Sequence, residues 1–210
     1  MYNVNEKEHI MEHEAIRTIM HKGYKISIHQ DVNFDKNPNE WNENIQLVYD
    51  HEYFYVKSDY VDFDPYETFK RYESGYKTHD RYYFFPVYAY IHSGVLLSLG
   101  RNGYPFTDQW DVSFKGFIYV KKNKEAYNMD KAFKLAELRI SVWNNFLNGY
   151  VFGYIIEDSE GNEIDSCWGF IGDTDYCLQE AKGIIDRIEV KRIARKESEL
   201  NAIQQKLLYM

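Results

Sequence analysis

The sequence is poor in the patterns that mark secreted, membrane-spanning and disulfide-rich proteins. It has only 4 Pro and 2 Cys, and no apolar run approaches the length that a membrane span requires. Two cysteines, Cys167 and Cys177, build no disulfide framework and no zinc site by themselves, which favours a reducing compartment. The N-terminal stretch carries acids and no apolar block. We therefore expect no signal peptide, no membrane association and a location in the cytoplasm.

Motifs for phosphate, zinc and acyl-transfer chemistry are also missing. There is no Gly-rich phosphate loop, no G-x-G-x-x-G after a strand, no G-x-S-x-G and no zinc-type spacing of Cys and His. A net charge of −8 and a pI of about 5.4 disfavour direct DNA binding. The sequence therefore predicts no cofactor, and it favours a binding protein over an enzyme.

Aromatic residues and alternating apolar patterns are abundant. The chain holds 20 Tyr, 13 Phe and 4 Trp, and the tyrosines suit half-buried strands and binding faces. The most apolar stretch, 82–120, is expected to form the centre of a sheet. Cys167 lies in an apolar strand pattern, so we expect it to be buried and inert.

The order of the patterns predicts an α+β fold with a mostly antiparallel or mixed sheet, because helices interrupt runs of hairpin-like strands. Helices are expected at about 6–21, 64–76, 130–148 and 175–208. Strands are expected at about 24–31, 82–91, 92–100 and 112–122, and on both sides of a hairpin turn at 159–162. Residues 45–56 are expected to form one strand, or two strands with a kink at Asp50-His51. Lys22-Gly23 is interpreted as the end of the first helix, and Asp130 as an N-cap. We expect a single α+β domain over 1–193, with 194–210 as a helical extension of the last helix.

The negative charge is concentrated in one segment. Residues 31–64 carry a net charge of −7, and aromatic residues alternate with the acids. Such a surface repels nucleic acid and attracts basic proteins, and its aromatics offer anchors for a partner. The alternative is a solvated acidic flank whose aromatics pack inward. The predicted binding residues are Asp31, Asp35, Glu40, Trp41, Glu43, Asp50, Glu52, Tyr55, Asp59, Tyr60, Asp62 and Asp64.

One group of residues could carry chemistry if the fold brought it together. His92, Asp108, Asp111 and Asp165 are oxygen and nitrogen ligands that suit Mg²⁺ or Mn²⁺ in a metal-dependent nuclease or phosphodiesterase. The sequence does not show that they meet, and the alternative is that Asp111 and Asp165 cap turns while Asp108 faces water. A catalytic Ser93 beside His92 is disfavoured, because the context of a nucleophile elbow is absent.

Three motifs resemble a family of uncharacterised bacteriophage and mobile-element proteins from Gram-positive hosts. The chain has PVYAYIHSGVLLSLG at 86–100, QWD followed by GFIYV within 109–120, and NGYVFGYIIED with DSCWGF within 148–170, in the same order as in that family. The resemblance covers about residues 86–185. It implies a genomic context in which accessory proteins inhibit host defence, as anti-CRISPR or antirestriction proteins do, and it carries no residue-level activity.

Three functions remain open at this point. The first is an interaction protein that binds a host defence protein through the acidic segment and blocks its nucleic-acid site. The second is the metal-dependent nuclease described above. The third is a structural or assembly role, with a homodimer formed through the C-terminal helix.

Overall fold

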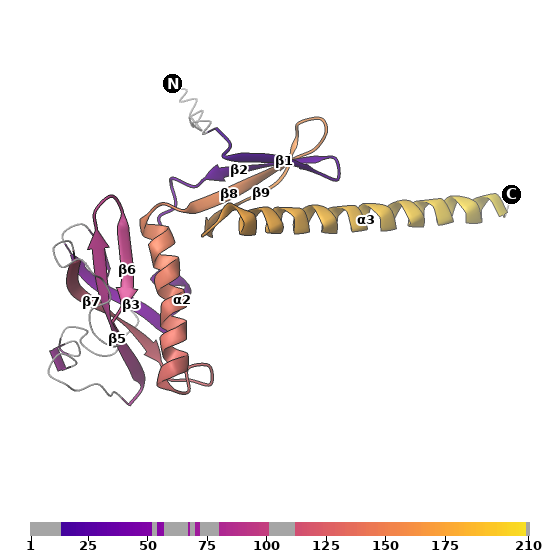
Figure 1. The fold of residues 1–210 in the computed structure, drawn as a ribbon. Coiled ribbons are helices and arrows are strands. Elements are labelled where there is room, and N and C mark those ends of the chain that lie inside the picture. Colours follow the sequence, from indigo (N-terminus) through magenta and orange to yellow (C-terminus); the bar gives the residue numbers. More distant parts are fainter. Residues whose placement is uncertain are drawn as a thin grey trace, which may run out of the picture. The chain divides into compact units, whose positions relative to one another are not determined.

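The computed structural model describes residues 14–51, 54–56, 67, 70–71, 80–100 and 112–208, with the backbone alone at 50, 51, 54–56 and 112–115. The fold is α+β, with two antiparallel sheets and a long helix packed against each (Figure 1). The contacts divide the chain into two compact units. Unit 1 contains residues 1–33 and 151–210, and unit 2 contains residues 34–150.

Unit 1 is a four-stranded sheet with one helix on one face. The strands have the spatial order β1-β2-β8-β9 and are all antiparallel to their neighbours. Their bounds are β1 Arg17–His21, β2 Tyr24–Gln30, β8 Val151–Glu157 and β9 Glu163–Ile171. Helix α3, Thr174–Leu208, packs against β2 and β8 and continues beyond the sheet (Figure 1). The core of the unit is made by Ile26, Ile28, Phe152, Tyr154, Ile156, Cys177, Leu178, Ala181 and Ile185.

The first hairpin corrects the expectation of a helix over 6–21. Residues 17–21 form β1, and residues 1–13 lie outside the described residues. Lys22 and Gly23 have φ of 48° and 86°, and His21 pairs with Tyr24, so these two residues form a tight hairpin turn. The Lys-Gly pair therefore ends a strand, because positive φ suits a two-residue hairpin loop as well as a helix end.

Ion pairs join this hairpin to α3. Asp186 on α3 lies 2.9 Å from the ring of His21 and 2.8 Å from Nζ of Lys22. Lys22 and then His21 lower the pKa of Asp186 below its usual range. At the other end of β1, Arg17 pairs with Asp175, in the first turn of the helix. These exposed pairs link β1, an edge strand, to the helix, and each contributes little stability by itself.

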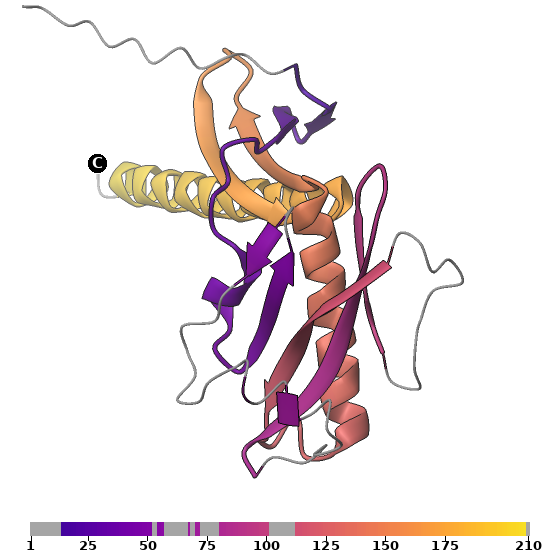
Figure 2. The same cartoon turned by 90° about the vertical axis from the view of Figure 1, so that its left-hand side faces the viewer.

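Unit 2 is a five-stranded antiparallel sheet with the order β4-β3-β7-β5-β6. Its elements are η1 Pro38–Trp41, β3 Ile45–His51, β4 Phe54–Val56, β5 Tyr82–Ile91, β6 Val95–Leu99, β7 Val112–Lys121 and α2 Met129–Leu147. Helix α2 lies along one face of this sheet, as Figure 2 shows. Its buried residues Ala132, Ala136, Ile140 and Trp143 pack against Leu47, Val87 and Ile118 of the strands.

The helix expected at 130–148 is confirmed with one change at its start. The N-cap is Asn128, whose side chain accepts a hydrogen bond from the backbone N–H of Lys131. Asp130 lies in the first turn, where its negative charge interacts favourably with the positive end of the helix dipole. The helix expected at 64–76 lies largely outside the described residues, of which Glu67, Lys70 and Arg71 are helical.

Two side-chain amides, one in the last turn of α2 and one at its C-cap, close the free edge of β6. Asn144 exchanges two hydrogen bonds with the backbone of Leu97, at 2.7 and 3.0 Å. Asn148 does the same with Val95, at 3.1 and 2.8 Å. An amide presents a donor and an acceptor side by side, so each asparagine substitutes for a residue of a neighbouring strand. This edge is therefore closed to further strand pairing.

A glycine in the centre of each sheet leaves room for an aromatic ring from the neighbouring strand to lie over it. A Cβ on Gly116 of β7 would lie 2.2 Å from the ring of Tyr49, its partner on β3. A Cβ on Gly153 of β8 would lie 2.2 Å from the ring of Trp168 on β9. Any larger residue at either position would displace the ring.

The sequence predicts one domain over 1–193, and the structure shows two compact units, each with its own sheet and core. Compactness does not decide whether the units unfold together, so the single-domain expectation stays a prediction. The helix that was expected as an extension beyond residue 193 is continuous with α3 through Leu208.

Candidate protein-binding surface

The structure describes only part of the predicted acidic segment. Side chains are described for Asp31, Asp35, Glu40, Trp41 and Glu43, whereas Asp50 and Tyr55 have backbone only and Glu52, Asp59, Tyr60, Asp62 and Asp64 lie outside the described residues. Asp31 belongs to unit 1 and the other four to unit 2. The surface that can be built is therefore residues 34–44, which we call the acidic loop.

Buried amides hold the acidic loop against β3. Asn39 is 3% exposed, and its side chain exchanges two hydrogen bonds with the backbone of Leu47, at 2.8 and 2.9 Å. Gln46, fully buried, donates from Nε2 to the carbonyl oxygens of Asn39 and Asn42, at 2.7 and 2.6 Å. The polar groups are satisfied, so their burial fixes the path of the loop instead of destabilising it.

Two further contacts set the loop's conformation. Nη1 of Arg139 on α2 donates to the carbonyl oxygen of Pro38 at 3.0 Å, and burial lowers the pKa of this guanidinium. Asn37 and Glu40 form a capping box at the start of η1, in which the Glu40 carboxylate accepts from the backbone N–H of Asn37 at 3.0 Å. Glu40 therefore has a structural role in addition to its charge.

Trp41 is the exposed aromatic residue of the loop. Its ring lies 5.9 Å from that of Phe34, and the Phe34 ring lies 6.3 Å from Phe146 on α2. Phe146 in turn packs at 5.7 Å against Trp143, which is buried in the core. Trp41 is 45% exposed, so one part of its ring is supported by this stack while another part is open to a partner.

Three carboxylates lie close to this tryptophan in the sequence of the loop, two before it and one after it. Asp35, Glu40 and Glu43 are all exposed, and Lys36 is the one basic residue between Phe34 and Asn44. Exposed charges near an aromatic anchor attract a basic partner and align it before the ring is buried. The loop thus presents three exposed carboxylates and a half-exposed tryptophan within nine residues, on a path that buried amides already fix.

The residues of the predicted metal site are not assembled by the described part of the chain. Among the described residues, no group of three or more His, Cys, Asp or Glu could hold a metal ion. His92 is exposed in the turn between β5 and β6, in unit 2, whereas Asp165 lies on β9 in unit 1. Asp108 and Asp111 lie outside the described residues.

Asp165 has a hydrogen-bonding role on the sheet of unit 1. Its Oδ2 accepts from the hydroxyl of Tyr154 at 2.9 Å. Burial, together with this bond, raises the pKa of the Tyr154 hydroxyl well above its usual range. Asp165 thus satisfies a buried phenol on the neighbouring strand, a role different from the turn cap that the sequence suggested.

Cys167 is a second correction, because its thiol is exposed. Its strand, β9, is the edge of the sheet, and α3 packs on β2 and β8. The apolar composition around Cys167 therefore does not bury it. Trp168, beside it, is 47% exposed and lies 6.2 Å from the ring of His29.

Sequence reasoning missed the residues that hold the acidic loop in place. Asn39, Gln46 and Arg139 are dispersed along the chain, and nothing local in the sequence indicates that they meet. Asn37 could have been found, because Asn-Pro followed by Glu40 has the spacing of a capping box with proline at the first helical position.

Comparisons with known proteins give no family for this chain. No family model, no curated protein and no solved structure matches it. Among the described residues, no helix is long and apolar enough to cross a membrane.

Proposed function

We propose that the protein binds a host nucleic-acid-targeting defence protein and inhibits it, as an accessory protein of a bacteriophage or mobile element of the anti-CRISPR or antirestriction type. The acidic segment 31–64 imitates the charge of a nucleic-acid backbone, and Trp41 anchors the complex. The genomic context in this proposal rests on the motif resemblance within 86–185.

One observation supports the proposal most. Trp41, 45% exposed, shares a short loop with Asp35, Glu40 and Glu43, and buried amides hold that loop against the sheet. A loop that is ordered before binding loses less conformational entropy on association. Tryptophan is also enriched among residues that dominate binding free energy.

The charge of the segment defines the kind of partner. Nucleic-acid-binding proteins carry basic grooves that accept a row of phosphates. A segment with net charge −7 suits such a groove, and within it the acidic loop contributes three exposed carboxylates close in sequence to Trp41. Binding would exclude the nucleic acid sterically and needs no chemistry from this chain.

Affinity capture from a host lysate treated with nuclease tests the proposal. Wild-type protein should retain a nucleic-acid-binding protein, which added DNA or RNA then displaces. Trp41→Ala should weaken this binding by about thirtyfold, as for an aromatic residue at the centre of an interface. Asp35→Asn with Glu43→Gln should weaken it less and should flatten its dependence on salt.

Matched controls keep the result specific. Tyr127→Ala removes an aromatic residue that is 63% exposed elsewhere in unit 2. Glu125→Gln with Glu137→Gln removes the same charge from exposed positions outside the loop. Equal losses with these controls, or retention of a partner that nucleic acid does not displace, would contradict the proposal.

A further inference from the structure

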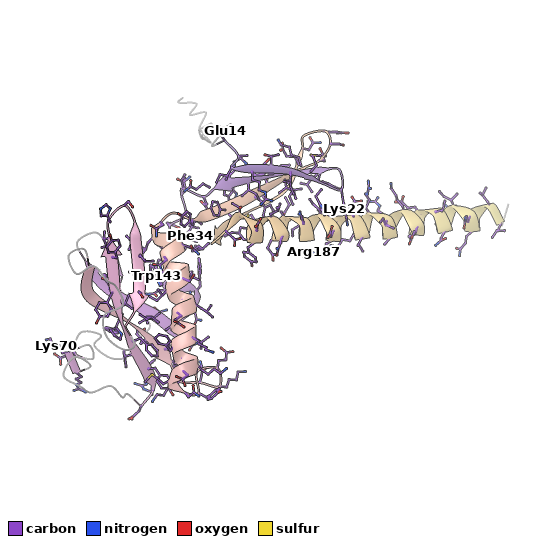
Figure 3. The ribbon with its side chains drawn as sticks, in the orientation of Figure 1. Glu14, Lys22, Phe34, Lys70, Trp143 and Arg187 are labelled. Carbon is purple, nitrogen blue, oxygen red and sulfur yellow. The ribbon has the colours of Figure 1, made fainter. Side chains whose placement is uncertain are left out.

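The outer part of α3 is a helix without a partner among the described residues. The helix has 35 residues, and Glu189 is the last that is buried. Every residue from 190 to 208 is exposed, as Figure 3 shows for the side chains that stand out on all sides of this part of the helix. Most helical stability in proteins comes from packing of an apolar face, so a partner on this part of α3 would stabilise it.

Large apolar residues follow one stripe of this exposed helix. Ile193, Leu200 and Leu207 are seven residues apart, and they are 53%, 56% and 68% exposed. Ile203, 56% exposed, lies on the same stripe, three residues after Leu200. This is the a and d spacing of a coiled coil, with Lys196 at the remaining d position.

We propose that a second copy of this chain covers the stripe in an antiparallel coiled coil, with Leu200 opposite Ile203 of the second copy. In this register, Lys196 lies opposite Leu207 of the second copy, where a long side chain can extend its charge to the surface. The inference goes beyond the proposed function, because it would hold whatever the acidic segment binds.

Charge complementarity selects the antiparallel register. Glu199 and Lys206 occupy g positions, and in an antiparallel pair centred between Leu200 and Ile203 each Glu199 faces the Lys206 of the second copy. A carboxylate accepts several hydrogen bonds, so Glu199 can keep its bond with Arg195 of its own helix, at 2.9 Å, and receive Lys206 as well.

The competing arrangements bring like charges together. A parallel pair places Lys196 against Lys196 in the seam. It also sets Arg192 opposite Glu197, an attractive pair that Arg192 can form beside its contact with Glu189 at 2.8 Å, but this does not remove the repulsion in the seam. An antiparallel pair shifted by one heptad places Glu199 against Glu199 and Arg192 against Lys206. Like charges opposite one another destabilise a coiled coil, so both alternatives are disfavoured.

Sedimentation of the full chain tests the association. The wild type should be dimeric at about 100 µM, a concentration suited to a short seam. Leu200→Glu should give a monomer with an unchanged melting temperature of the sheets, because Leu200 contacts neither core cluster. A monomeric wild type at that concentration would overturn the proposal.

Charge reversal tests the register. Glu199→Lys alone and Lys206→Glu alone should each weaken the dimer by about tenfold, because two attractive pairs become repulsive. A mixture of the two variants should restore a heterodimer, whereas Ser198→Lys and Gln205→Glu, on the outer side of the helix, should have little effect. Failure of the mixture to associate would overturn the register.

Disulfide trapping tests the direction. In a Cys167→Ser background, which removes the exposed native thiol, Leu200→Cys mixed with Ile203→Cys should form a mixed disulfide on oxidation. A parallel pair would instead link Leu200→Cys to itself. That outcome would contradict the antiparallel arrangement while leaving the binding function untouched.

Discussion

Cys167 and Cys177 lie only ten positions apart but experience opposite environments. Cys167 is exposed on an edge strand, whereas Cys177 is completely buried between α3 and the sheet. Burial raises the pKa of the Cys177 thiol to about 12. Only the thiolate reacts as a nucleophile, so the two cysteines should differ in reactivity.

We predict that a thiol reagent labels one cysteine in the folded chain and two in the unfolded chain at about pH 8, which is near the ordinary thiol pKa. Cys167→Ser should abolish the labelling of the folded chain. The unfolded chain ionises Cys177 at a lower pH than the folded chain does, so Cys177 should make the fold less stable as pH rises above that ordinary value. Rapid labelling of Cys177 in the folded protein, measured by mass spectrometry, would contradict the account.

The free edge of the unit 2 sheet shows what single side chains do for an element. Asn144 and Asn148 each replace two strand-to-strand hydrogen bonds of β6. Without them, the backbone of Val95 and Leu97 would lose these partners and the edge would be open to other strands.

We predict that Asn144→Ala lowers the free energy of unfolding by about 1–2 kcal/mol, because two part-buried hydrogen bonds are lost. Asn148→Ala should cost less, since its bonds are exposed. Asn145→Ala, on the same helix, is the control and should be close to neutral. Urea unfolding measures all three variants, and an equal loss for the control would contradict the role of the Asn144 hydrogen bonds, because Asn→Ala in a helix raises helix propensity.

The elements that sequence could predict are those whose patterns are local. The apolar periods of α2 and α3 and the alternation of β2, β5 and β7 appear directly in the chain. The prediction of a helix over 6–21 was wrong for residues 17–21, which form β1. Ile16, Ile19 and Met20 fit a helical spacing, and the local sequence does not reveal the pairing of β1 with β2. The same limit applies to the acidic loop, whose charges are evident in the sequence while the amides that hold it are not.

At the scale of the molecule, the sequence of one compact unit, residues 34–150, is inserted between the two sequence segments that make up the other unit. Sequence patterns gave no sign of this division, because both units use the same hairpin-like strands. Each unit has its own sheet and its own helix, with one core cluster in unit 1 and two in unit 2.

The single-domain expectation predicts one cooperative unfolding transition. In calorimetry, the calorimetric and van't Hoff enthalpies should then agree. Two separate transitions would contradict it, as would a fragment of residues 34–150 that unfolds cooperatively by itself. Either result would establish the two compact units as domains.

The central claim is that the acidic segment, anchored by Trp41, occupies the nucleic-acid site of a host protein. The most direct test is the nuclease-treated lysate capture, with wild type and Trp41→Ala compared in the same experiment. The wild type should capture a nucleic-acid-binding protein, and added nucleic acid should displace that protein. Trp41→Ala should bind the same protein about thirtyfold more weakly. Undiminished capture by Trp41→Ala, or a partner that nucleic acid fails to displace, would contradict the claim.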